Sequence, residues 1–210
     1  MHHRYKKTGI LLLGLLLSCG ACISLKQPPR EIRFYTLEYA PPRINGLGPL
    51  SAVIRVERFG VAPVYNTTRI VYREAAFKRS EYVRFRWRAN PGDLVTYFLT
   101  RDMNRSGLFR AVLPADTGIP CSHRMEGSVN RFLEEDTEEN WTAALSVGIT
   151  IMAENEPDVS RRVLFQRVYE VRKPCKARHP DALARAMSLA MKEASEKIIR
   201  DIHRVLSRPR

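Results

Sequence analysis

The clearest chemical pattern in this 210-residue sequence is a set of arginines at alternate positions. Arg84, Arg86 and Arg88 lie in one segment, and Arg69 and Arg73 lie in the segment before it. Side chains repeat with period two along a strand, so Arg84, Arg86 and Arg88 would project from one face, about 7 Å apart. Guanidinium groups bind carboxylates and phosphates bidentately. If the segments pair as a hairpin, we interpret the five arginines as a docking surface for an acidic partner or lipid phosphates. The alternative is a solvated sheet face.

The residues between the arginines of the second segment are apolar. Val83, Phe85 and Trp87 alternate with the arginines, which predicts that these three side chains face the core. We therefore interpret Trp87 as a core residue rather than as a surface aromatic that binds a ligand.

The N-terminus carries a different chemistry, that of lipid attachment at Cys19. Basic residues precede an apolar run at residues 10–17, which is shorter than the roughly 20 residues of a membrane-spanning helix and typical of a secretory signal peptide. Residues 16–19, Leu-Leu-Ser-Cys, resemble the bacterial lipobox, which implies cleavage before Cys19 and lipidation of its thiol. Cys22 is a weaker candidate because no apolar residue stands three positions before it. The other alternative is an ordinary cleaved signal peptide.

Two later cysteines, Cys121 and Cys175, each follow a proline. An even pair in an oxidising compartment is a candidate disulfide, which would contribute about 3–4 kcal/mol by the chain-entropy relation. One objection is geometric. In a plain strand meander the two cysteines lie at opposite ends, roughly 33 Å apart, whereas a disulfide needs a Cα separation of ~6 Å. The sequence leaves both outcomes open.

Other groups that could hold a metal or catalyse a reaction do not match known patterns. Cys121-x-His123 and Cys175-x₃-His179 have the ligand types of zinc sites but not a common spacing, so we expect no metal. The acidic residues at 134–139 lack the order of a calcium loop and are interpreted as a solvated turn. The sequence contains no nucleophile elbow, zinc-protease helix or phosphate-binding glycine loop. We expect neither a cofactor nor enzyme activity.

The formal net charge of the whole chain is +13. Inside a cell, such a basic protein would suggest a nucleic-acid partner. An exported chain instead faces anionic lipid headgroups or acidic proteins. We therefore expect a membrane or a protein partner and no nucleic acid.

The elements that must position these residues follow from periodicity and capping signals. Alternation and β-forming residues predict strands at residues 34–37, 53–61, 69–73, 81–88, 109–113, 124–133, 141–152 and 162–171. An apolar stripe between Asn90 and Gly107 predicts a helix with an N-cap and a glycine stop, and a second helix is expected at residues 180–206. The predicted fold class is α+β, a mostly antiparallel sheet with two main helices packed against it.

Three blocks of sequence resemble the ABC-type transport auxiliary lipoprotein family, which includes the paraquat-inducible protein C type. They are FYTLEY at residues 34–39, VAPVYNTTRIVYRE at 61–74 and YVRFRWRANPGDLVTYFLTRDMNRSGLF at 82–109. The resemblance implies a non-catalytic partner of an ABC transporter that has a mammalian-cell-entry (MCE) component. Transport systems of this type move lipids or other hydrophobic molecules between two membranes. The expected partners are the MCE-domain protein with its permease and ATPase, and a homo-oligomer would suit a tunnel-forming partner.

Together these observations predict a signal peptide at residues 1–18, a lipidated anchor and tether at 19–33 and a family domain at 34–206. The residues after Cys19 lack the Asp that often signals inner-membrane retention, so we expect the outer membrane of a diderm bacterium, facing the periplasm. The alternatives are a structural or assembly lipoprotein of the outer membrane with no transporter, and, less favoured, a lipid-anchored hydrolase.

Overall fold

The computed structural model describes residues 31–137 and 140–208. The expected lipidation site, Cys19, and most of the expected tether lie outside these residues. From Ile32 onward the chain forms one compact unit, which contains all the helices and strands described below.

Two main helices form where the sequence carries capping signals. α2 spans Pro91–Ser106, and Asn90 Oδ1 accepts a hydrogen bond from the Gly92 N–H at 3.0 Å. It ends at Gly107, whose φ of 66° is the left-handed conformation that glycine adopts readily. α4 spans Pro180–Leu206. Both predicted helices are confirmed. None of the helices in the described part of the chain combines the length and apolar character needed to cross a membrane.

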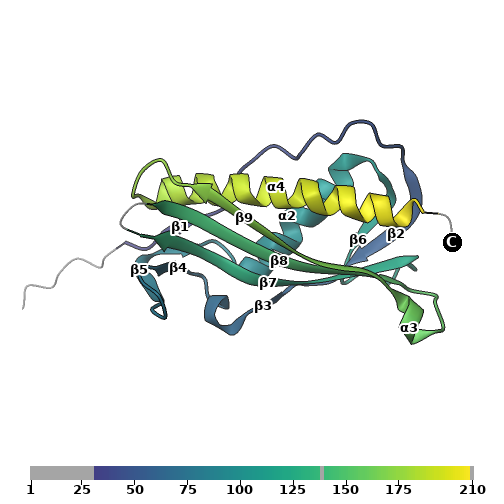
Figure 1. The fold of residues 1–210 in the computed structure, drawn as a ribbon, viewed down its shortest axis with the longest axis horizontal. Coiled ribbons are helices and arrows are strands. Elements are labelled where there is room, and N and C mark those ends of the chain that lie inside the picture. Colours follow the sequence, from purple (N-terminus) through teal and green to yellow (C-terminus); the bar gives the residue numbers. More distant parts are fainter. Residues whose placement is uncertain (1–30, 138–139, 209–210) are drawn as a thin grey trace, which may run out of the picture. The chain divides into compact units, whose positions relative to one another are not determined.

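The strands of the described residues join in one sheet (Figure 1). In chain order they are β1 (Arg33–Tyr35), β2 (Leu50–Val56), β3 (Gly60–Val61), β4 (Arg69–Arg73), β5 (Ser80–Trp87), β6 (Phe109–Pro114), β7 (His123–Asp136), β8 (Trp141–Ala153) and β9 (Val163–Pro174). Two short helical segments complete the fold, η2 (Pro63–Tyr65) and α3 (Val159–Arg162).

The sheet is mixed. β7, β8 and β9 form a long antiparallel meander, and β4 pairs antiparallel with β5. The remaining pairs are parallel: β1 with β5, β2 with β6, and β2, β3 and β4 each with β7. The α+β class and the two main helices are therefore confirmed, and the prediction of a mostly antiparallel sheet is wrong.

Most of the parallel pairs arise because the chain from β2 to β4 runs once along the edge of β7, in the direction of β7. Successive pairs join Ile54 to His123 in β2, Gly60 to Ser128 in β3, and Tyr72 to Glu134 in β4. The three short strands therefore share the direction of β7, with loops between them. Alternation in the sequence indicates which face of a strand is buried, but not the direction of its neighbour.

Both main helices pack on one face of the sheet, which we call the helix face; the opposite side is the outer face (Figure 1). The largest side chains buried here include Ile54, Trp87, Leu99, Met103, Phe132, Leu145, Ile149, Leu183 and Met187. The rings of Trp87 and Phe132 meet edge to face, 5.1 Å apart. The interpretation of Trp87 as a core residue is confirmed.

Val83 departs from the predicted alternation, because its side chain is 77% exposed. β4 and β5 pair at Val71 with Glu81 and at Arg69 with Arg86, so extra residues of β5 lie between these two pairs. Such a bulge changes the face to which the following side chains point. The expectation that Val83 faces the core is therefore wrong.

Candidate docking surface

Arg69 of β4 and Arg86 of β5 lie directly opposite each other on the outer face. The two are cross-strand partners, whereas the residues that follow each of them, Ile70 and Trp87, are buried on the helix face. The Arg69 Nη1 also forms an ion pair with Glu81 Oε2 at 3.0 Å. This carboxylate offsets part of the repulsion between two like charges on neighbouring strands. Arg86 Nε is buried and has no hydrogen-bond partner among the described residues.

Arg73, at the end of β4, belongs to a cluster of ion pairs. Its Nη2 lies 2.7 Å from Glu135 Oε1, and Arg172 Nε of β9 lies 3.0 Å from Glu135 Oε2. Next to this cluster, Arg178 Nη2 lies 3.4 Å from Asp136 Oδ1. These contacts tie β4, β7 and the chain after β9 together. They also pair Glu135 and Asp136 of the acidic segment 134–139, and because Glu135 is buried at the end of β7 the prediction of a solvated turn is wrong at this residue.

The other two arginines lie nearer the edge of the sheet formed by β1. Arg84 is exposed in the β5 bulge and forms no ion pair with another described residue. The guanidinium of Arg88 lies over the Phe34 ring, 5.1 Å from its centroid, a cation–π contact. The five predicted arginines therefore divide between the outer face and this edge, rather than forming one row.

A buried carboxylate, Glu134, lies under the same hairpin on the helix face. The Tyr82 hydroxyl donates to Glu134 Oε1 at 3.0 Å. Burial raises the pKa of Glu134, and burial together with the nearby Glu134 charge raises the pKa of the Tyr82 phenol. The Tyr82 ring also packs against Tyr72 and Phe85, with centroids 4.8 and 5.6 Å away. Sequence reasoning missed this contact, because Glu134 was assigned to the solvated turn.

The loop between β4 and β5, residues 74–79, carries a second feature that the sequence analysis missed. We call it the hairpin loop. Phe77 within it is fully exposed and has a φ of 63°, a conformation that bulky residues seldom adopt. The signal that the sequence offered was an aromatic residue beside Lys78 and Arg79 in the connection between the two strands.

The two larger open cavities described here lie away from the hairpin. One, of about 650 Å³, lies near the end of α4 and is lined by residues that include Ser122, His123, Asn155, Glu156, Leu164 and Leu206. The other, of about 480 Å³, lies along α2 and is lined by residues that include Val56, Thr96, Tyr97, Thr100, Pro114 and Ala115.

The first cavity contains a serine next to a histidine, which could suggest nucleophilic chemistry. The Ser122 hydroxyl, however, donates to the Val53 carbonyl at 3.0 Å and accepts from the Val53 N–H at 2.9 Å. His123 Nδ1 lies 2.9 Å from the same hydroxyl. The hydroxyl is therefore engaged in joining β2 to the start of β7, which is a structural contact.

Cys121 and Cys175 are free thiols in this structure. Cys121 precedes β7, and the Cys175 N–H donates to the Trp141 carbonyl near the far end of that strand. β7, β8 and β9 form the plain meander that separates the two cysteines, so a bond within one chain would need another strand order. In the described residues, no three His, Cys, Asp or Glu side chains are grouped to hold a metal ion.

The domain that carries these features matches one known family model over most of its length. Residues 35–199 match the model of the ABC-type transport auxiliary lipoprotein component. The chain belongs to this family. The match runs from β1 into α4 and so includes the hairpin, the meander and both main helices. Membership confirms the resemblance and makes the chain a lipoprotein component associated with an ABC transporter in the bacterial cell envelope.

Solved structures share the fold at low sequence identity. Protein XCC0632 from Xanthomonas campestris has a TM-score of 0.74 and 17% identity, over 82% of this chain and 95% of that one. The hypothetical protein CT253 from Chlamydia trachomatis has a TM-score of 0.53 and 8% identity, over 75% and 99% of the two chains. No curated protein matches the chain.

Proposed function

We propose that this chain is a non-catalytic, lipid-anchored periplasmic component of an MCE-type ABC transport system that moves lipid or another hydrophobic substrate between membranes. The observation that carries the proposal is the family match over residues 35–199. In this arrangement the anchor holds one end of an assembly between the membranes, and the folded domain docks the MCE partner.

The proposed anchor is Cys19, with residues 1–18 removed, residues 19–33 as the tether and residues 34–206 as the family domain. Several acyl chains hold a protein firmly on a membrane, whereas one chain binds only marginally. We expect Cys19→Ser to abolish acylation, measured by metabolic labelling with palmitate and by the mass of the mature chain. Cys22→Ser is the matched control and should be acylated and cleaved normally. Acylation that depends on Cys22 instead would refute the assignment of the anchor. Fractionation should place the protein in the outer membrane.

The proposed docking surface is the arginine-bearing hairpin, because Arg84 and Arg88 are exposed there and lack ion-pair partners among the described residues. The first test is affinity purification from gently solubilised membranes with Cys19 intact, followed by mass spectrometry. Recovery of an MCE-domain protein with its permease and ATPase is expected. A homo-oligomer, which would suit a tunnel-forming partner, should then appear in native mass spectrometry of the same preparation.

A matched pair of variants then tests the surface itself. The double variant Arg84→Glu, Arg88→Glu should reduce recovery of the MCE protein without lowering the melting temperature. The control, Arg110→Glu, reverses an exposed charge on β6, which lies at the far end of the strand order β1-β5-β4-β7-β2-β6, and should leave recovery unchanged. Equal recovery from all variants would exclude the arginines as the docking surface. Recovery of outer-membrane proteins alone would instead favour a structural lipoprotein without a transporter.

A further inference from the structure

The hairpin loop presents an aromatic side chain to the surroundings of the domain. Phe77 is fully exposed, and its left-handed backbone places it at the turn between Ala75 and Lys78, where the Lys78 N–H approaches the Ala75 carbonyl at 3.4 Å. A single exposed apolar side chain is common on a protein surface, whereas a bulky residue with a positive φ is a genuine outlier. An apolar environment outside the domain would remove this ring from water.

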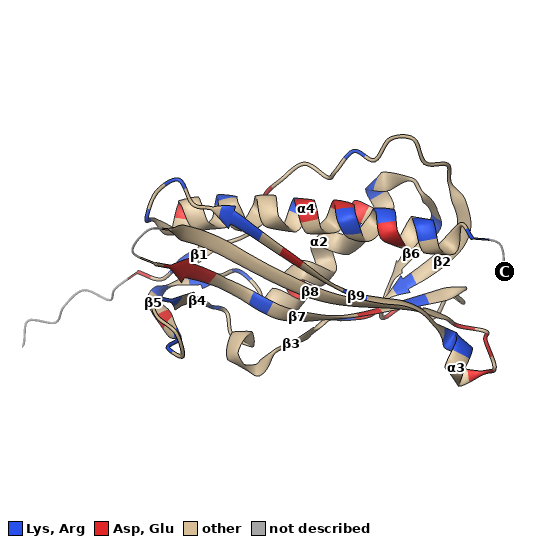
Figure 2. Ribbon diagram, viewed as in Figure 1, with Lys and Arg blue, Asp and Glu red and all other residues tan. Residues whose placement is uncertain are grey.

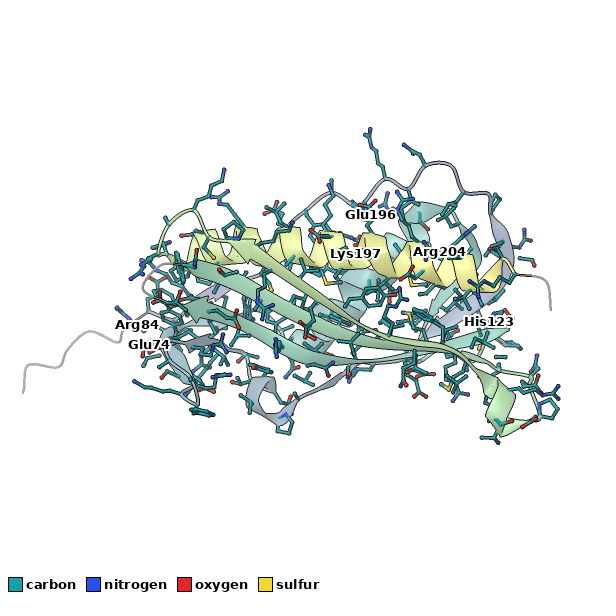
Figure 3. All side chains as sticks on the ribbon, in the orientation of Figure 1. Glu74, Arg84, His123, Glu196, Lys197 and Arg204 are labelled. Atoms are coloured by element: carbon teal, nitrogen blue, oxygen red, sulfur yellow. The ribbon has the colours of Figure 1, made fainter. Side chains whose placement is uncertain are left out.

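The surroundings of this aromatic residue are basic. Lys78 and Arg79 follow it and are exposed. Lys78 forms an exposed ion pair with Glu74 at 3.3 Å, a type of pair that contributes little to stability, and Glu81 lies 3.0 Å from Arg69. Arg79 forms no ion pair with another described residue. Figure 2 shows basic residues at the end of the domain where β4 and β5 lie, and Figure 3 labels the exposed Arg84 at this end. The charge complements an anionic surface.

The start of the folded domain lies beside the same hairpin. β1 pairs with β5, with Arg33 opposite Phe85. Ile32, Phe34 and Val83 add exposed apolar side chains to this region. With Cys19 as the anchor, the chain up to Ile32 reaches at most roughly 45 Å when fully extended. With this anchor, this part of the domain could lie no farther than that length from the lipid headgroups.

We propose that the hairpin loop is a second membrane contact, in which Phe77 inserts into the interface of an anionic bilayer and Lys78 and Arg79 bind lipid phosphates. An apolar side chain beside cations matches the apolar-to-charged boundary of a lipid interface. An exposed loop can also enter a lipid bilayer, because a bilayer deforms around it and needs no preformed pocket. The inference rests on the proposed anchor only for proximity, and it is independent of the MCE partner.

The test uses the complete acylated protein, reconstituted in vesicles of phosphatidylethanolamine and phosphatidylglycerol that contain brominated acyl chains. Phe77→Trp places a fluorophore in the hairpin loop. Val159→Trp is the matched control, because Val159 is also an exposed apolar residue, at 72%, but lies in α3, at the opposite end of the domain in Figure 1. The native Trp87 and Trp141 are buried and common to all variants. Co-flotation with the vesicles reports separately on the anchor, and thermal melting reports on folding.

We expect bromolipid to quench the fluorescence added by Phe77→Trp and not that added by Val159→Trp. Adding Lys78→Glu and Arg79→Glu to the first variant, or using vesicles of phosphatidylcholine alone, should reduce the quenching. Equal quenching of the two reporters in protein that floats and melts normally would overturn the inference. A shift of the residue-77 fluorescence that follows protein concentration, without bromolipid quenching, would also overturn it, because a second copy would then cover the loop.

Discussion

The Tyr39 hydroxyl donates a hydrogen bond to Asp102 Oδ2 at 2.8 Å, inside the domain. Asp102, on α2, is fully buried, and its other oxygen accepts two hydrogen bonds from Arg101, at 2.9 and 2.7 Å. The Arg101 guanidinium lies 4.4 Å from the Tyr39 ring centroid and 4.6 Å from that of Phe98. The contact fastens the chain that follows β1 to α2, so the start of the described domain is held by a main helix.

Removing this hydroxyl should destabilise the domain. Tyr39→Phe leaves one buried carboxylate oxygen without its donor, and we expect the free energy of unfolding to fall by about 1–3 kcal/mol, the cost of an unsatisfied buried polar group. Urea denaturation measures the change. Tyr97→Phe is the matched control on the same helix, since Tyr97 is 64% exposed, and it should have little effect. Equal stability of the two variants would show that the Asp102 contact contributes nothing.

The buried Glu134 should make stability depend on pH. Because burial raises its pKa, the folded state holds this proton more tightly than the unfolded state. Protonated Glu134 therefore stabilises the folded state at low pH. The free energy of unfolding falls as pH rises from the ordinary pKa range of a carboxyl group through the raised pKa of Glu134. Glu134→Gln removes the titrating group and should weaken this decline, measured by urea denaturation from acid to neutral pH. Glu126→Gln, at an exposed position of β7, should keep the wild-type decline. If the Glu134→Gln variant showed a pH profile parallel to that of the wild type, the prediction would be contradicted.

The thiol of Cys175 should react slowly at neutral pH. Burial, with a further contribution from the Glu134 charge, raises its pKa to about 11, and only the thiolate is a good nucleophile. Alkylation by iodoacetamide, followed by peptide mass spectrometry, should therefore be slower at Cys175 than at the thiol introduced by Val159→Cys, and should accelerate as pH rises toward 11. After denaturation both native thiols of the domain should react with a thiol reagent. A lack of free thiol at that point would instead indicate a disulfide.

Local sequence signals predicted the elements whose ends and buried faces depend on residues close together in the chain. β8 alternates from Trp141 to Ala153 with its apolar residues on the helix face, as expected. α2 begins after Asn90 and ends at Gly107, because capping side chains and a left-handed glycine act within a few residues. The prediction for residues 53–61 was less successful, since the chain there divides into β2 and β3 along the edge of β7.

The candidate site was predictable in its residue types but not in its arrangement. Arginine alternation in β5 was visible, yet the bulge after Glu81 exposed Val83 and separated Arg84 from Arg86. Arg73 found a partner in Glu135, which is distant in sequence. Such pairs depend on which strands become neighbours, and no local pattern contains that information.

The sequence by itself determined the family, the two main helices and the buried face of β8, because each of these depends on residues close together in the chain. A lipidated leader at Cys19 stays a prediction. Only the tertiary structure decided that short parallel strands line the edge of β7, that Glu134 is buried beneath Tyr82, and that Phe77 is left exposed at a basic hairpin. These outcomes depend on long-range packing, in which strand direction, bulges and ion-pair partners are selected by the whole domain at once.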